Sequence, residues 1–224
     1  TSTGFYNTGG SSESVYISGK YAYVADGSSG LQIIDIASST NPFPVGSYNT
    51  AGTSEGVYIS GKYAYVADGA SGLQIIDISN PFNPVLIGTY NTPGTAARVY
   101  VAGKYAYVAD AGSGLQIIDI SNPVSSTLIS NFSTLDSIIG IYVSGRYAYV
   151  ADSDSGLKII DVSNPSSPTS TGIYNTSGIA QGVYVSGKYA YVADGASGLQ
   201  IIDVSSPSSP NLIGTYDTSG TAIN

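Results

Sequence analysis

Two aspartates recur in every repeat of this sequence, and they account for ten of its 15 acidic residues. The segment YAYVADGSSGLQIIDI starts at Tyr21 and returns almost unchanged four more times at a constant spacing of 42 residues. The first aspartate opens a Gly-Ser loop in each copy: Asp26, Asp68, Asp110, Asp152 and Asp194. The second ends an apolar run in each copy: Asp35, Asp77, Asp119, Asp161 and Asp203. Aspartate at the start of a loop usually accepts hydrogen bonds from the backbone of its own turn. Because every repeat keeps both residues, whereas an active site needs asymmetry, we expect structural roles.

One loop departs from this pattern in a way that could bind a cation. The segment DSDSG places the carboxylates of Asp152 and Asp154 two positions apart, as in many oxygen-ligand loops for calcium. A third acidic residue and a distal glutamate are missing from the segment. Asp152 and Asp154 are therefore a weak calcium candidate, and we expect no bound cofactor or structural metal.

The sequence offers few groups for catalysis. It contains no His and no Cys, which excludes Ser-His and Cys-His nucleophile pairs and the usual zinc ligands. Glycosidases need only two carboxylates, and the two glutamates, Glu13 and Glu55, lie one repeat apart. We expect them at equivalent places on neighbouring repeats, near the loops before the first strands, as interaction candidates. The expectation is a protein that is not an enzyme.

The repeats predict an all-β fold. In the first complete copy, short apolar runs over residues 15–17, 21–25, 31–36 and 45–50 are separated by Gly, Asn and Pro turns. A period of 42 residues is typical of a four-stranded propeller blade. The repeat cores lie near residues 15–50, 57–92, 99–134, 141–176 and 183–218. The second and third runs are apolar on both faces, so both faces must be covered, which a ring of blades achieves by repetition.

These motifs resemble the LVIVD-repeat family of bacterial and archaeal cell-surface proteins. The resemblance rests on Leu31-Gln32-Ile33-Ile34-Asp35 and its four copies, each preceded by Tyr-Val-Ala-Asp and most followed closely by Asn-Pro. Gln or Lys stands where the family name has its first Val. The resemblance implies a β-propeller and no catalytic residues. Together with the repeat count, it predicts one five-bladed β-propeller domain over residues 1–224.

The fourth-strand signature occurs six times, although five blades need only five fourth strands. The first occurrence includes Phe5 and Tyr6, and the last includes Tyr216. We expect residues 1–14 to hold an extra terminal strand. A surplus strand could add to the sheet edge of a neighbouring molecule, or it could fold back locally. Phe5, Tyr6 and Tyr216 are interaction candidates.

Variation between the repeats suggests where contacts with other molecules could lie. The loop before the first strand changes from copy to copy, and in the fourth copy it carries two bulky apolar residues, Ile138 and Ile139. Drift of an unconstrained surface explains such variation most simply. The alternative is contacts in a stack of discs, for which Ile138 and Ile139 are the candidate contact residues. The four tyrosines per repeat are expected to fill the space between blades, with sugar-binding platforms as the alternative.

Composition narrows the partners. The net charge is −8 with only seven basic residues and no basic cluster, which argues against nucleic-acid binding and attraction to anionic lipid. No apolar run is long enough to insert in a membrane. Asn131 and Asn175 begin sequons and are glycosylation candidates if the chain is exported. We therefore predict an extracellular or cell-surface structural protein whose partners are copies of itself, with a module that binds cell-surface glycans as the alternative.

Overall fold

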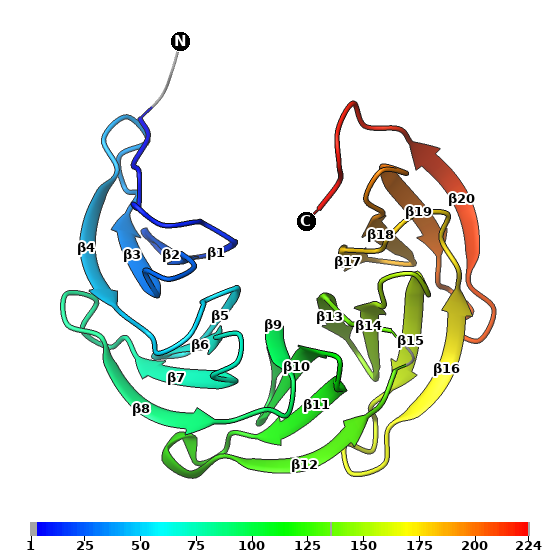
Figure 1. Ribbon diagram of the computed structural model, residues 1–224, viewed down its shortest axis with the longest axis horizontal. Coiled ribbons are helices and arrows are strands. Elements are labelled where there is room, and N and C mark those ends of the chain that lie inside the picture. The colour runs from blue at the N-terminus through cyan, green and yellow to red at the C-terminus, as the bar shows by residue number, and fades with distance from the viewer. Residues whose placement is uncertain (1–3, 135, 224) are drawn as a thin grey trace. The chain divides into compact units, whose positions relative to one another are not determined.

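The computed structural model describes residues 4–134 and 136–223, and its elements form five four-stranded antiparallel sheets (Figure 1). Each sheet comes from one repeat, and its strands pair in chain order from the first to the fourth. Within the described residues the only helical element is the single 3₁₀ turn η1 (Pro123–Ser125). The predicted fold class, all-β with five four-stranded blades, is confirmed.

The strand bounds repeat with little change from sheet to sheet. Sheet one contains β1 (Ser14–Ser18), β2 (Tyr21–Ala25), β3 (Leu31–Asp35) and β4 (Phe43–Tyr48). Sheet two contains β5 (Gly56–Ser60), β6 (Tyr63–Ala67), β7 (Leu73–Asp77) and β8 (Val85–Tyr90). Sheet three contains β9 (Thr95–Ala102), β10 (Tyr105–Ala111), β11 (Gly114–Asp119) and β12 (Thr127–Phe132). Sheet four contains β13 (Gly140–Ser144), β14 (Tyr147–Ala151), β15 (Leu157–Asp161) and β16 (Thr169–Tyr174). Sheet five contains β17 (Gly182–Ser186), β18 (Tyr189–Ala193), β19 (Leu199–Asp203) and β20 (Asn211–Tyr216).

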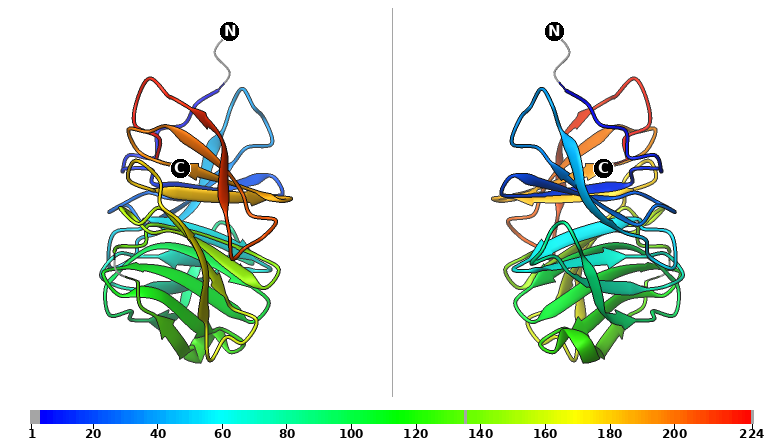
Figure 2. Two further views of the ribbon diagram at one scale, coloured as in Figure 1. Left: turned by 90° about the vertical axis from the view of Figure 1, so that its right-hand side faces the viewer. Right: turned by 90° about the vertical axis from the view of Figure 1, so that its left-hand side faces the viewer.

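The internal contacts divide the chain into two compact units. The first comprises residues 1–104 and 120–127, and the second comprises residues 105–119 and 128–224. In the first unit, β1 lies beside β5 and β5 beside β9; in the second, β13 lies beside β17. The strands of each sheet twist progressively from the first to the fourth, as the side views in Figure 2 show.

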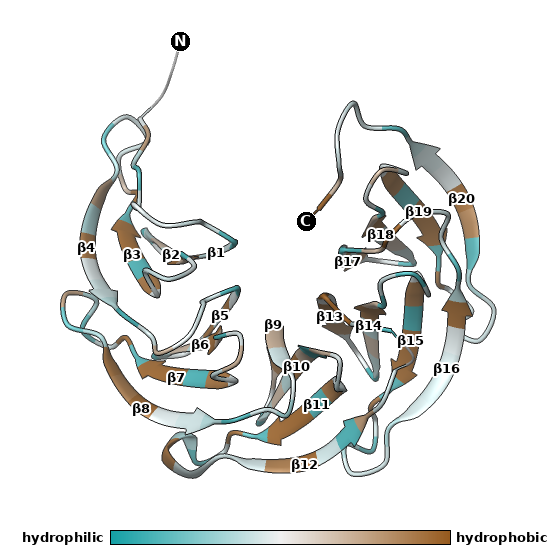
Figure 3. Ribbon diagram, viewed as in Figure 1, coloured by the Kyte–Doolittle hydropathy of each residue, from teal (hydrophilic) through white to brown (hydrophobic). Residues whose placement is uncertain are grey.

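Each sheet packs through a different set of side chains on each face, because successive residues of a strand point in opposite directions. Figure 3 shows apolar residues concentrated on the central strands. In the first unit, Tyr23, Ala25, Leu31 and Ile33 of sheet one form one core cluster with residues of sheet two: Val57, Ile59, Ala64, Val66, Ile76 and Ile78. We call the side of a sheet that meets the following sheet its forward face, and the side that meets the preceding sheet its rear face. The same names are used for the equivalent sides of sheets one and five.

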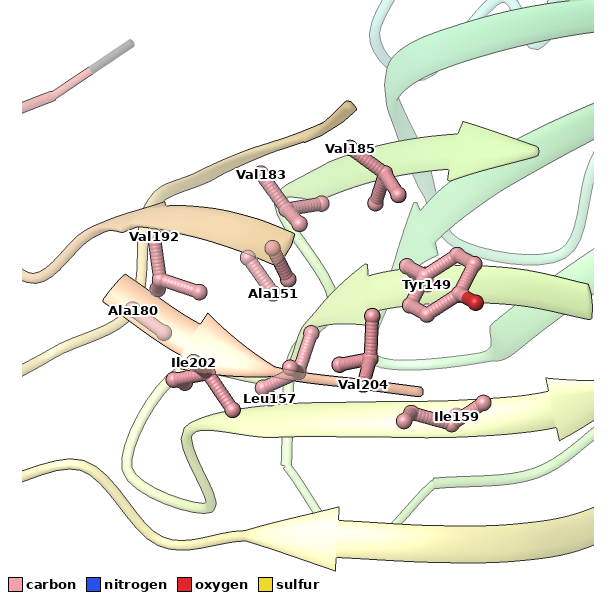
Figure 4. Packing of buried hydrophobic residues seen from close by; sticks show 11 residues of the cluster. Tyr149, Ala151, Leu157, Ile159, Ala180, Val183, Val185, Val192, Ile202 and Val204 are labelled. Atoms are coloured by element: carbon pink, nitrogen blue, oxygen red, sulfur yellow. The ribbon is translucent and has the colours of Figure 1, made fainter. Parts of the chain in front are cut away.

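The second unit repeats this packing. The forward face of sheet four presents Tyr149, Ala151, Leu157 and Ile159, and Figure 4 shows them against the rear face of sheet five. That rear face supplies Val183, Val185, Ala190, Val192, Ile202 and Val204. The prediction that both faces of the central strands are apolar because both are covered is therefore confirmed at these junctions.

The fourth strands approach the following sheet so closely that one position has almost no room for a side chain. A Cβ atom added to Gly46 would overlap the carbonyl oxygen of Pro81, and one added to Gly88 would overlap that of Pro123. In sheet three the same position is Ser130, whose hydroxyl donates a hydrogen bond of 2.6 Å to the carbonyl oxygen of Pro165. Glycine or a small donor at this position thus allows neighbouring sheets to meet along their fourth strands.

Residues 4–13 form no strand, and β1 begins at Ser14. The expectation of an extra terminal strand over residues 1–14 is therefore wrong for residues 4–13, while residues 1–3 lie outside the described residues. Sheet five is completed by β20, which pairs with β19 of the same repeat. The surplus fourth-strand signature is thus the first one, around Phe5 and Tyr6.

The close approach at Gly46 generates a testable prediction. Gly46→Ala should lower the free energy of unfolding by about 1–3 kcal/mol, because the added methyl group must displace the Pro81 backbone. The measurement is equilibrium unfolding in urea.

Gly214→Ala is the matched control, since it alters the same repeat position in sheet five. A Cβ there meets only the Cδ1 atom of Ile201, at 3.8 Å, which is ordinary contact. Equal destabilisation by Gly46→Ala and Gly214→Ala would contradict the proposed clash.

Candidate interaction surfaces

In sheets one, two and five, the first aspartate of the repeat binds the loop that precedes its own sheet. The Asp68 side chain is fully buried and accepts hydrogen bonds from the Thr50 hydroxyl at 2.5 Å, the Ser54 hydroxyl at 3.0 Å and the Gly52 amide at 2.8 Å. Our expectation that this carboxylate binds its own turn is therefore wrong. Its partners lie 14–18 residues earlier in the chain, a separation at which the sequence showed no pairing signal.

The same loop also binds the preceding sheet. Ser54 and Gly27 exchange two backbone hydrogen bonds, of 2.9 and 3.1 Å, and Ala96 pairs with Gly69 in the same way. In the second unit, Ala180 forms such a bridge with Ser153 and Ala222 with Gly195. A loop such as residues 50–54 thus contacts the preceding sheet through its backbone and its own sheet through the buried aspartate.

The second aspartate caps its own turn, as predicted. The Oδ1 atom of Asp35 accepts a hydrogen bond of 2.9 Å from the Ala37 amide, and Asp77 does the same with Ser79. Several of these carboxylates also pair with a Lys or Arg from the turn between the first and second strands. In sheet one, the Nζ atom of Lys20 lies 2.8 Å from Oδ2 of Asp35. Hydrogen bonds from Arg146 and then Ser163 hold the pKa of Asp161 at about 2.

Sheet four replaces the loop contacts of its first aspartate with a buried ion pair. The Nζ atom of Lys158 lies 2.8 Å from Oδ2 of Asp152, and both side chains are almost completely buried. Asp136 occupies the same repeat position as Gly52 of sheet two. A Cβ added to Gly52 would overlap the Asp68 backbone, so a loop with a side chain at this position cannot lie against the aspartate in the same way. The Thr134 hydroxyl turns to the Asp136 carbonyl instead, at 2.7 Å. Oδ1 of Asp152 is left without a hydrogen-bond partner.

This ion pair bears on the calcium candidate. The Lys158 ammonium already neutralises Asp152, and the side chain of Asp154 is exposed. Across residues 4–134 and 136–223, no group of three or more His, Cys, Asp or Glu side chains is placed to hold a metal ion. The geometry therefore gives no support to a cation site at Asp152 and Asp154.

Glu13 and Glu55 lie at equivalent places on neighbouring sheets, and Arg98 joins their backbones. The guanidinium of Arg98 donates hydrogen bonds to the carbonyl oxygens of Glu55 at 2.7 Å, Ala97 at 2.8 Å and Glu13 at 3.4 Å. Burial raises the pKa of the Glu55 carboxyl, and the charge of Arg98 opposes that rise. Arg98 therefore ties together the chain just before β1 and β5 and within β9, a role that the sequence did not reveal.

The tyrosines at two repeat positions have different surroundings. Those at the centre of the second strands in sheets one to four are buried between sheets, as predicted: Tyr23, Tyr65, Tyr107 and Tyr149. Those on the first strands stack on one another, with ring centroids 4.9 Å apart for Tyr16 and Tyr58. Because the rings contact one another, their faces are less available as sugar-binding platforms.

The remaining interaction candidates have different environments. Phe5 is 86% exposed and Tyr216 is 68% exposed, and Tyr6 is exposed to a smaller degree. Ile138, a candidate contact residue, is fully buried. It occupies the position of Ser54 and Ala180, where the loop packs into the fold, so this candidate is wrong; Ile139 is half-buried.

The sequon residues Asn131 and Asn175 are both exposed, so their glycosylation stays a prediction.

Two sheet faces are less buried than the faces at the internal junctions. On the rear face of sheet one, Val15 is 60% exposed and Ile17 is 62% exposed, whereas their equivalents Val57 and Ile59 are each 6% exposed. On the forward face of sheet five, the four core positions are only half-buried: Tyr191, Ala193, Leu199 and Ile201. The rear face of sheet one therefore exposes Val15 and Ile17, although Ala22, Val24 and Ile34 on the same face are buried. The forward face of sheet five is less buried than its equivalents.

The ion pair in sheet four generates a second prediction. Lys158→Gln should lower the free energy of unfolding by about 3–5 kcal/mol, because it leaves the Asp152 carboxylate buried without a cation. Adding Asp136→Gly should recover most of that loss by restoring the loop amide that binds aspartate elsewhere. Urea unfolding of the single and double variants measures both effects.

Lys62→Gln is the control for this cycle, since Lys62 is exposed and pairs with Asp77 on the surface. Its effect on the free energy of unfolding should be much smaller, because an ion pair exposed to solvent is screened. Additive effects of Lys158→Gln and Asp136→Gly would show that the two positions are not coupled.

Asp161 generates a third prediction, for acid. Its folded-state pKa of about 2 lies below the ordinary value of 3.8, so its contribution to stability is present above about pH 4 and is lost as the pH falls toward 2. Arg146→Gln should remove part of this contribution. The difference in unfolding free energy between the wild type and Arg146→Gln should be largest above pH 4 and should shrink toward pH 2; a difference independent of pH would contradict this cause.

Comparisons with known proteins place this geometry in context. The family model described as LVIVD repeat matches the chain five times, at residues 9–50, 51–92, 93–134, 139–176 and 177–218. Among curated proteins, none matches the sequence.

Solved structures share the fold. A functionally unknown protein from Desulfotomaculum acetoxidans DSM 771 is 15% identical with a TM-score of 0.79, and the match covers 95% of this chain and 72% of that one. The β-propeller domain of Myceliophteria thermophila Cps50 (Swd1) is 13% identical with a TM-score of 0.74, over 95% and 73% of the two chains. The computationally designed Ika8 protein is 6% identical with a TM-score of 0.69, over 95% and 76%.

These similarities are of low identity, so they bear on the fold alone, while the family follows from the five matches along the chain. Each match contains one four-stranded sheet, and the resemblance expected from the Leu-Gln-Ile-Ile-Asp motif is confirmed. The chain belongs to the LVIVD-repeat family and has its β-propeller fold.

Proposed function

We propose that this protein is a non-catalytic structural protein that assembles with copies of itself outside the cell, in a filament or a surface layer. The observation that carries the proposal is the exposure of Val15 and Ile17 on the rear face of sheet one. Large exposed apolar side chains in one patch mark sites of protein association. A second copy supplies a matching partner. Inside each unit a rear face packs against the forward face of the preceding sheet, and sheet five of the second copy has such a forward face.

The energetics favour covering this face. Full burial of a valine or isoleucine side chain contributes about 1.5–3 kcal/mol relative to exposure. At the internal junction of the first unit, Val57 and Ile59 gain this contribution against sheet one. Val15 and Ile17 would gain it against a partner that presents the same kind of surface.

A structural role also agrees with the chemistry of the chain. The sequence has no His or Cys, and the family match names a repeat and no reaction. The backbone carbonyls of the two glutamates accept hydrogen bonds from Arg98. Among the described residues, no helix has the length and hydropathy needed to cross a membrane. The exposed sequons and the resemblance to surface proteins support an extracellular setting as part of this proposal.

The proposal generates a fourth prediction. Val15→Asp combined with Ile17→Asp should abolish self-association, because two carboxylates on the rear face of sheet one would have to be buried without partners. Sedimentation velocity over a wide range of concentrations, together with electron microscopy, measures the effect.

Val124→Asp is the control, since Val124 is 71% exposed in η1 and away from the rear face of sheet one. It should associate like the wild type. Isolated discs of the wild type at every concentration would contradict the proposal, and binding of the wild type to a glycan array would then favour the carbohydrate-binding alternative.

A further inference from the structure

The segment of residues 4–12 lies on sheet one at the position that the end of a preceding repeat would occupy. We infer that this position is also a docking site for residues 214–222 of a second copy of the chain, and that the two segments exchange there. The inference rests on the self-assembly proposed above. The sequences GFYNTGGSS (residues 4–12) and GTYDTSGTA (residues 214–222) cover the same nine positions of the repeat.

Residues 4–12 bind sheet one through a small set of contacts. The Gly4 amide donates a hydrogen bond of 2.8 Å to the carbonyl oxygen of Ser39. The carboxylate of Asp26 accepts three more, from the Thr8 hydroxyl at 2.5 Å, the Gly10 amide at 3.0 Å and the Ser12 hydroxyl at 2.9 Å. Since Asp26 is completely buried, these donors are needed to stabilise its charge.

An internal junction shows the same contacts made by the end of a preceding repeat. On sheet five, Asp194 accepts hydrogen bonds from the Thr176 hydroxyl at 2.5 Å and the Gly178 amide at 2.9 Å. At the start of the same segment, Gly172 lies against Pro207 and Pro210, and Gly4 lies against Thr40 and Pro42, where Pro42 corresponds to Pro210. Residues 4–12 therefore take the place on sheet one that residues 172–180 take on sheet five.

Residues 214–222 make only half of the contacts that such a segment makes elsewhere. Ala222 pairs with Gly195 of its own sheet through backbone hydrogen bonds of 2.9 and 3.1 Å, like Ala180 with Ser153. The Thr218 hydroxyl, which would bind the aspartate of a following sheet, donates instead to the carbonyl oxygen of Gly220 at 2.6 Å. The segment thus has a hydroxyl and an amide that could donate hydrogen bonds to a buried aspartate. Asp26 of a second copy is a carboxylate that accepts hydrogen bonds from donors at these positions.

The chemistry of residues 214–222 suits Asp26. Thr218 and Gly220 correspond to Thr176 and Gly178, the two residues that bind Asp194. Ala222 lacks the hydroxyl of Ser12, but Ala180 lacks it too. Docking there would bring the forward face of sheet five onto the exposed Val15 and Ile17. Because Asp26 cannot bind both segments, residues 4–12 limit the association of two copies until they are displaced.

The first experiment measures docking directly, with a labelled peptide of residues 214–222 and the full chain carrying Thr8→Val and Ser12→Ala. These changes remove two donors to Asp26 and loosen the competing segment. We expect the peptide to bind this variant about tenfold more tightly than the wild type, measured by fluorescence anisotropy. A control peptide with Thr218→Val should bind neither protein well. Equal binding of the two peptides, or no binding to the folded variant, would overturn the inference.

The second experiment measures association of the same variant by sedimentation velocity. The concentration at half-association should fall about tenfold relative to the wild type. Adding Gly214→Ala should reverse that gain, because the new Cβ would overlap the partner's proline loop, although it meets only Ile201 within its own chain. Association of all variants at one concentration would overturn the exchange while leaving self-assembly in place. If no variant associates, self-assembly fails, and specific peptide binding would still support the docking site.

Discussion

The fold depends on the pairing of apolar sheet faces. Tyr23 and Leu31 on the forward face of sheet one are buried because Val57 and Ile59 cover them from the next sheet. A single sheet of this kind would expose apolar side chains on both sides, so no repeat can be stable alone and each neighbour stabilises the next. The same constraint makes the rear face of sheet one a candidate interaction surface, since its side chains are of the type that is buried elsewhere.

The buried aspartates add direction to this packing. Apolar faces alone would allow neighbouring sheets to slide, because burial of apolar area is not directional. A carboxylate such as Asp68 requires donors at fixed positions, and a loop that also pairs with Gly27 provides them. Sheet four shows the coupling between these parts. Where Asp136 replaces the loop glycine, Lys158 replaces the usual glutamine and neutralises Asp152.

Much of the architecture was predictable from local patterns. The Ser-Gly-Lys turn and the alternation of Tyr21 to Ala25 indicated a hairpin with two apolar faces, and the structure has β1 and β2 there. The partners of the first aspartates were not predictable, because Thr50 and Asp68 are 18 residues apart and become neighbours only when the sheet forms. Ile138 was misplaced for a related reason: a loop residue is expected to be exposed, but this loop packs into the fold.

The sequence by itself determined the repeat, the four strands of each sheet and the two-sided apolar pattern, since these follow from side-chain type and a period of two along a strand. Only the tertiary structure decided which sheet faces are covered, which donors reach Asp26 and where the surplus fourth-strand signature lies. Residues 4–12 and 214–222 are nearly equivalent as sequences. Contact with sheet one separates them, because Thr8 reaches the Asp26 carboxylate while Thr218 reaches only the backbone of its own segment.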